Sequence, residues 1–95
     1  MIKEIINEVK NKKAIIKDKK SLKELIRAYL KLDEKPDFVS LWKGKIEVGY
    51  YFTRNPKVVK RISFGPFINF LKRNDINVRE IEAENDEERN ILTHL

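Results

Sequence analysis

The sequence predicts a small α+β domain, and three observations lead to this prediction. The chain has 95 residues, which is the length of one domain. Hydrophobic residues make up 41% of it, enough for a core, and no Pro/Gly/Ser-rich linker divides it. Segments with helical spacing alternate with short runs rich in β-branched and aromatic residues. We therefore expect one domain over residues 1–95, with a mixed or antiparallel sheet of three to five strands flanked by helices.

The N-terminal third of the chain is predicted to form two helices with a short strand between them. An amphipathic N-terminal helix is expected over residues 1–12, and the apolar run at 14–16 reads as a brief strand. Ser21 and Glu24 have the spacing of a capping box, in which each side chain satisfies a free backbone amide. The helix that they open must end before Pro36, because proline disfavours a helical residue in front of it.

Strands follow in the middle of the chain. The segments 38–42 and 46–52 are rich in β-branched and aromatic residues, and a Lys-Gly pair between them predicts a hairpin. A turn is expected at 55–56, a third strand over 58–64 and a last strand over 76–81. The core order is then helix, three strands, helix, strand.

Two further helices complete the pattern. Pro66 suits the first position of a helix, which Asn74 and the following aspartate end. Three phenylalanines, Phe64, Phe67 and Phe70, are expected in the core. A second capping-box pattern at the start of residues 85–95 predicts a C-terminal helix.

The charge is basic and unevenly distributed. The net charge is +6, but residues 1–75 carry 19 Lys/Arg against 9 Asp/Glu, whereas residues 76–95 carry 2 against 6. A basic body favours polyanions, above all nucleic acid, although Lys-rich runs also serve as solvated surface. The candidate phosphate contacts lie on or beside the expected strands; they are Lys43, Lys45, Arg54, Lys57, Lys60 and Arg61.

Aromatic side chains interleave with these cations. Trp42 and Tyr51 are the candidate interaction aromatics, since rings beside cations can stack on unpaired bases or anchor a protein interface. Tyr50 and Tyr51 are adjacent on a strand, so one of them must face outward. The alternative is that alternate rings of the hairpin belong to the core.

Several classes of function are disfavoured. The chain has no cysteine, which excludes disulfides, thiolate zinc sites and cysteine nucleophiles. Its three glycines form no phosphate-binding loop, and the single histidine, His94, lies one residue from the end. The start has no apolar signal core and no stretch resembles a membrane span, so we expect a cytoplasmic protein of its own or a host cell.

One stretch nevertheless resembles a known family. The order of residues is Pro36-Asp37-Phe38-Val39-Ser40-Leu41-Trp42-Lys43-Gly44-Lys45-Ile46, followed by a second apolar strand. This resembles the active-site hairpin of the PD-(D/E)xK nuclease superfamily, especially archaeal Holliday-junction resolvases, over residues 36–82. The resemblance implies a Pro-Asp that opens one strand and a Glu-x-Lys on the next, with carboxylates that hold Mg²⁺ and a lysine that orients water.

The chain departs from that family at the catalytic positions. Tyr50-Tyr51-Phe52 stand where the Glu-x-Lys is expected, and none of these side chains can replace it. Glu47 lies at an odd offset from the expected glutamate and points to the other face of the strand. Asp37 is thus the only catalytic residue that the resemblance carries over, and it is equally a turn residue beside proline.

The resulting prediction is a nucleic-acid-binding domain without catalytic activity and without a cofactor, with the form of a degenerate nuclease. One alternative is a small protein-interaction module or inhibitor of the viral or mobile-element kind, acting on a nucleic-acid-processing partner. A second is a Mg²⁺-dependent nuclease that combines Asp37 with Glu47, Glu8 or Glu24. An exposed strand edge would also allow a homodimer.

Overall fold

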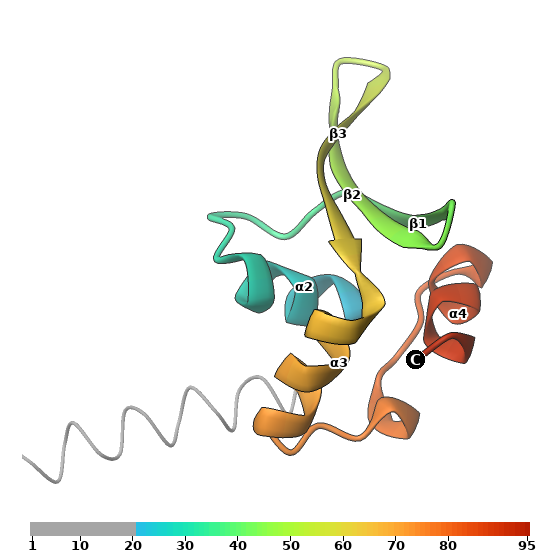
Figure 1. Ribbon diagram of the computed structural model, residues 1–95. Coiled ribbons are helices and arrows are strands. Elements are labelled where there is room, and N and C mark those ends of the chain that lie inside the picture. Colours follow the sequence, from blue (N-terminus) through green and yellow to red (C-terminus); the bar gives the residue numbers. More distant parts are fainter. Residues whose placement is uncertain (1–20) are drawn as a thin grey trace, which may run out of the picture.

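The computed structural model describes residues 21–95, and Figure 1 shows their arrangement. The elements are α2 (Leu22–Leu30), β1 (Phe38–Trp42), β2 (Lys45–Phe52), β3 (Asn55–Ser63), α3 (Phe64–Arg73), the 3₁₀ turn η1 (Val78–Glu80) and α4 (Asp86–Thr93). The α+β class is confirmed. The helix expected over residues 1–12 and the strand expected at 14–16 lie outside the described residues.

The three strands form an antiparallel sheet in the order β1-β2-β3. A two-residue turn joins β1 to β2, and both of its residues have positive φ, 47° at Lys43 and 76° at Gly44. This backbone matches the natural twist of a hairpin and favours glycine. The end of the β2–β3 hairpin that carries its turn projects beyond the rest of the domain (Figure 1).

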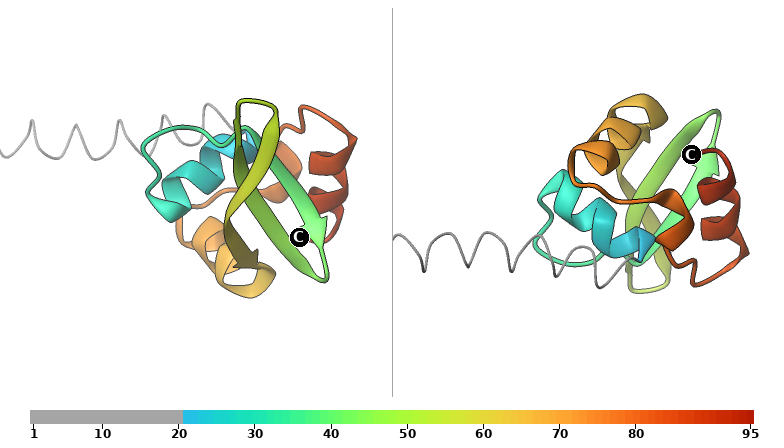
Figure 2. Two further views of the ribbon diagram at one scale, coloured as in Figure 1. Left: turned by 90° about the horizontal axis from the view of Figure 1, so that it is seen from above. Right: turned by 90° about the horizontal axis from the view of Figure 1, so that it is seen from below.

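The helices lie to one side of the sheet. Figure 2 shows α2 and α3 on that side, with α4 beside β1, so no helix of residues 21–95 covers the opposite face of the strands. We call the side toward the helices the inner face and the opposite side the outer face. The core fills the space between the sheet and the helices; its buried residues are Leu22, Leu25, Ile26, Val39, Ile46, Val48, Ile62, Phe67, Leu71, Ile76, Ile81 and Ile91.

Both expected helix caps are present. The Ser21 hydroxyl accepts a hydrogen bond from the Glu24 amide at 3.2 Å, and the Asn85 side chain accepts one from the Glu88 amide at 2.9 Å. The Glu88 carboxylate reaches back to the Glu84 amide, one residue before the cap itself. The two caps therefore fix where α2 and α4 begin.

A buried ion pair joins these two helices. Glu88 is completely buried, and its carboxylate lies 3.5 Å from the ammonium of Lys23, whose side chain is only 11% exposed. Glu84 contacts the same ammonium at 3.3 Å. Lys23 lies near the beginning of the described chain, and Glu84 and Glu88 lie near its end. These ion pairs therefore hold the two ends of the described chain together.

Helix α4 also covers the free edge of β1. The backbone amide of Leu41 donates a hydrogen bond to the Glu87 carboxylate at 2.8 Å. This amide is therefore not available to pair with a further strand at this edge. The strand expected over 76–81 is wrong: that segment contains the 3₁₀ turn η1, and the Asn77 side chain accepts a hydrogen bond from the Arg79 amide within it. Directly after this segment, Glu82 forms a single parallel bridge with Ser21.

Smaller differences concern the turn and the phenylalanines. The second turn is at residues 53–54, where Thr53 has a φ of 57°, and β3 already begins at Asn55. Phe67 is fully buried as expected, whereas Phe64 and Phe70 are half-buried at the margin of the core. The α3 helix begins at Phe64, because Ser63 ends the sheet pairing with Lys45.

Candidate nucleic-acid interface

The six candidate cations all lie on the hairpins, and all are exposed. Lys43 and Lys45 belong to the β1–β2 turn and the start of β2, and Arg61 lies across the sheet from them on β3. Arg54 lies in the turn at the projecting tip of the β2–β3 hairpin, beyond Phe52, which is seven residues from Lys45 along β2, or roughly 23 Å at the usual rise of a strand. Lys57 pairs with Tyr50, five residues from Lys45 along the same strand. Lys60 lies between the two groups. The structure therefore places the candidate cations along the whole length of the two-stranded ribbon formed by β2 and β3.

Most of these cations have no counter-charge in the part of the chain that the structure describes. Arg61 pairs with Glu47 at 3.0 Å. Within residues 21–95, no carboxylate forms an ion pair with the other five candidate cations. The acidic C-terminal segment is largely committed elsewhere, since Glu84 and Glu88 bind Lys23 and Asp86 binds Arg89. The positive charge of the hairpin thus faces solvent.

Aromatic rings accompany the cations at both ends of the hairpin. Trp42, Tyr51 and Phe52 are 43%, 55% and 56% exposed. Near the turn, the Lys43 ammonium and the Arg61 guanidinium lie 4.6 and 4.8 Å from the Trp42 ring centre. At the tip, the Lys57 ammonium lies 5.7 Å from the Phe52 ring centre. Of the two adjacent tyrosines, one was expected to face outward, and this is confirmed: Tyr51 is exposed while Tyr50 is half-buried.

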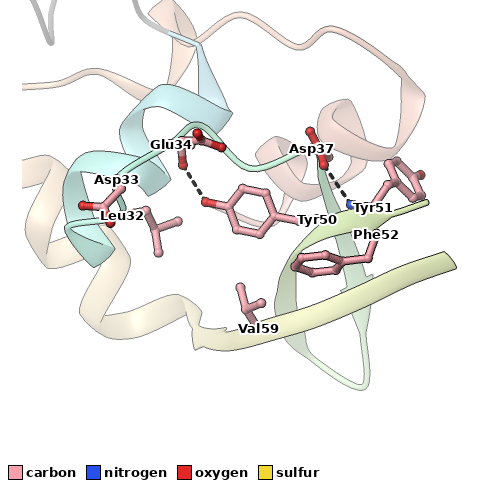
Figure 3. Close-up of a pocket in the computed structure, with 8 residues that line it drawn as sticks. All are labelled: Leu32, Asp33, Glu34, Asp37, Tyr50, Tyr51, Phe52 and Val59. Carbon is pink, nitrogen blue, oxygen red and sulfur yellow. Dashed lines mark hydrogen bonds between the residues drawn. The ribbon is translucent and has the colours of Figure 1, made fainter. Parts of the chain in front are cut away.

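A groove runs along the inner face of the hairpin near its tip (Figure 3). Its volume is about 570 Å³. The lining residues are Leu32, Asp33, Glu34, Asp37, Tyr50, Tyr51, Phe52 and Val59. The Tyr50 hydroxyl donates a hydrogen bond to the Glu34 carbonyl oxygen, and partial burial together with the nearby Glu34 and Asp37 carboxylates raises the pKa of this phenol. Tyr50 is therefore a fixed hydrogen-bond donor that holds the α2–β1 loop against the hairpin.

Asp37 has a structural position at this groove. Its amide donates to the Gly49 carbonyl oxygen at 2.9 Å, and its carboxylate accepts a hydrogen bond from the Tyr51 amide at 2.8 Å (Figure 3). Glu47 and Glu24 bind Arg61 and Arg27 respectively, so the structure does not gather them around Asp37. Glu8 lies outside the described residues. In residues 21–95, no three His, Cys, Asp or Glu side chains are placed to hold a metal ion.

Replacing Asp37 by alanine is expected to lower the free energy of unfolding by about 1 kcal/mol, because the Tyr51 amide loses its acceptor at an exposed site. Asp37→Asn retains an acceptor oxygen and should be nearly neutral. Chemical denaturation of the three proteins measures both effects. A Mg²⁺-dependent rise in stability that is present in the wild type and absent from Asp37→Asn would contradict a purely structural role.

Comparison with known proteins adds no relative. No family model, curated protein or solved structure matches the chain. The resemblance to the nuclease superfamily therefore stays a prediction. No helix among residues 21–95 has the length and apolar character needed to cross a membrane.

Phe52 is the functional candidate that sequence reasoning did not single out. Strand alternation places Phe52 on the same face as the core residues Ile46 and Val48, which favours burial. It is exposed because the tip of the hairpin extends past the helices that cover the rest of that face (Figure 1). Only the length of the hairpin relative to the helices distinguishes these two outcomes, and the sequence pattern does not carry that information.

Proposed function

We propose that the protein binds nucleic acid, DNA or RNA, without catalysing a reaction on it. The observation that carries this proposal is the hairpin surface on which five of the six candidate cations have no counter-charge within residues 21–95. An exposed lysine or arginine that is already paired gains little from a phosphate. Lys43, Lys45, Arg54, Lys57 and Lys60 keep their full attraction for a polyanion, and binding releases the counterions of the phosphates.

The arrangement of the cations also supports this proposal. They follow a ribbon over roughly 23 Å, which suits a ligand with a repeating charge better than a single acidic side chain. At its two ends, exposed rings lie beside cations, as in sites that contact both the backbone and the bases of a nucleic acid. No helix of the described residues 21–95 lies over the outer face of the sheet, so that a ligand can approach this face past them (Figure 2).

The proposal predicts binding that depends strongly on salt and on the tip of the hairpin. Fluorescence anisotropy with labelled DNA and RNA oligonucleotides, between about 50 and 200 mM salt, measures the slope of log K against log salt concentration. The double variant Arg54→Gln/Lys57→Gln should bind more weakly. Each lost phosphate contact should reduce the magnitude of the slope by about 0.7 to 0.9.

A matched control is available at the other end of the molecule. Lys72 and Arg73 are exposed in the last turn of α3, far from the tip of the hairpin (Figure 1). The double variant Lys72→Gln/Arg73→Gln removes the same two charges and should leave the slope almost unchanged. Equal losses in both double variants would indicate attraction by net charge alone, and the absence of binding at low salt would refute the proposal.

A protein-interaction module is the second candidate function. The observation in its favour is the exposed apolar surface at the tip, where Phe52 and Val59 are 56% and 44% exposed beside the edge strand β3. The two candidates differ in their response to salt, because contact between apolar surfaces persists at about 200 mM salt whereas phosphate contacts weaken steeply.

A further inference from the structure

We infer that the nucleic acid is single-stranded and that an unpaired base stacks on Phe52, with its phosphate on the side of Lys57. This inference rests on the proposed function and names the form of ligand that the tip of the hairpin fits.

The surroundings of Phe52 form a stacking site. Its ring is 56% exposed and lies over the groove, which the Tyr50 ring and the side chains of Leu32 and Val59 also line (Figure 3). The Lys57 ammonium is 5.7 Å from the centre of the ring. An apolar platform of this kind beside a cation offers a surface for the face of a base and a charge for the attached phosphate.

The other exposed rings are less available. The Trp42 ring already has two cations near it, Lys43 and Arg61. The Tyr51 ring leans on the Phe38 ring, with a distance of 5.4 Å between their centres. Of these three exposed rings, the Phe52 ring has the fewest close partners among residues 21–95, with one cation at 5.7 Å.

The charges around the groove set the direction in which a strand would lie. Asp33 and Glu34 are exposed at the rim formed by the α2–β1 loop, and they repel phosphates. The Lys57 ammonium lies on the hairpin side, over the Phe52 ring, and Arg54 belongs to the adjoining turn. The backbone of a bound strand therefore follows the hairpin, while the base points inward over the ring of Phe52.

A base offers its face only when it is unstacked. In a duplex the base faces are covered by their neighbours, so a duplex can use the cations of the hairpin but not the Phe52 ring. A single strand uses both. Each base that stacks on an aromatic side chain adds to the binding free energy. The tip of the hairpin should therefore bind single strands more tightly than duplexes.

The test uses a labelled oligonucleotide strand and the same strand annealed to its complement, with anisotropy measured at one low salt concentration. The wild type should bind the single strand more tightly than the duplex. Phe52→Leu keeps an apolar side chain but removes the aromatic face, and it should weaken binding to the single strand about tenfold while binding to the duplex stays nearly constant. Phe52→Tyr keeps the ring and should retain the preference of the wild type. Thermal unfolding of each variant verifies that the fold is intact.

The outcomes separate this inference from the proposed function. If neither form binds, both fail. If the duplex binds as tightly as the single strand, or if Phe52→Leu weakens both forms equally, the inference fails and the proposed function stands. If Phe52→Tyr loses as much affinity as Phe52→Leu, stacking on the ring is refuted even when a preference for single strands is observed.

Discussion

Replacing Lys23 by methionine is expected to lower the free energy of unfolding by about 3 kcal/mol, because the change leaves the Glu88 carboxylate buried without its counter-charge. Methionine retains the apolar length of the lysine side chain, so the loss of packing is small. The Glu88 carboxylate keeps its hydrogen bonds from the Glu84 amide and the Asn85 side chain, which places the expected loss at the lower end of the range for broken buried pairs. Equilibrium denaturation with urea measures the change.

Two further variants test the cause. The double variant Lys23→Met/Glu88→Leu removes both charges and should recover a large part of the loss, since a buried ion pair can be replaced by apolar side chains of similar size. Arg89→Gln removes a surface ion pair with Asp86, in which both side chains are mostly exposed, and should change the stability by less than about 1 kcal/mol. If Lys23→Met proved as mild as Arg89→Gln, the pair would not have the role that its burial indicates.

Replacing Gly49 by alanine is expected to destabilise the protein by about 3 kcal/mol. A Cβ atom at this position would overlap the carbonyl oxygen of Lys57 and the ring of Phe38. The first neighbour is backbone of the adjacent strand and cannot move without breaking the pairing. The second supports the Tyr51 ring, so the change should also disturb the aromatic pair on the outer face. This is overpacking at a site with no free space.

Gly65 supplies the control for this prediction. It lies in the first turn of α3, and a Cβ atom there would meet no atom within 4 Å. Gly65→Ala should be neutral or stabilising by up to about 1 kcal/mol, because alanine favours the helix over the unfolded chain. Thermal unfolding of the two variants side by side measures the contrast. A similar loss in both would show that steric overlap at Gly49 is not its cause.

Local signals predicted most of the fold. The Ser21 and Asn85 caps, the Lys-Gly turn and the strands on either side of it depend on a few neighbouring residues, and each is confirmed. The segment 76–81 failed for a reason of tertiary structure. Its Ile76 and Ile81 are both buried, although their odd spacing would place them on opposite faces of a strand. Helix α4 occupies the free edge of β1, and the Asn77 side chain bonds the backbone into a 3₁₀ turn instead.

The candidate site was predictable only as a list of residue types. The cations and exposed rings were named from composition and strand alternation, and the structure places them on one ribbon. The bulge opposite Val48 and Gly49 could not be anticipated, because it is a property of the pairing between β2 and β3 and not of either strand alone. The bulge shifts the alternation of side chains along β3 at Val59. Simple alternation from Ile62 would turn Val59 outward, but it lines the groove.

The contact between Glu87 and the Leu41 amide limits how copies of the molecule could join through their sheets. With β1 closed by α4, β3 is the open edge of the sheet in the described part of the chain. A molecule with one such edge can add one partner strand and then has no second edge from which to continue, so association by strand pairing would end at two copies instead of growing into a fibre. Self-pairing of β3 would also bring its lysines and arginine close to their counterparts, which opposes it.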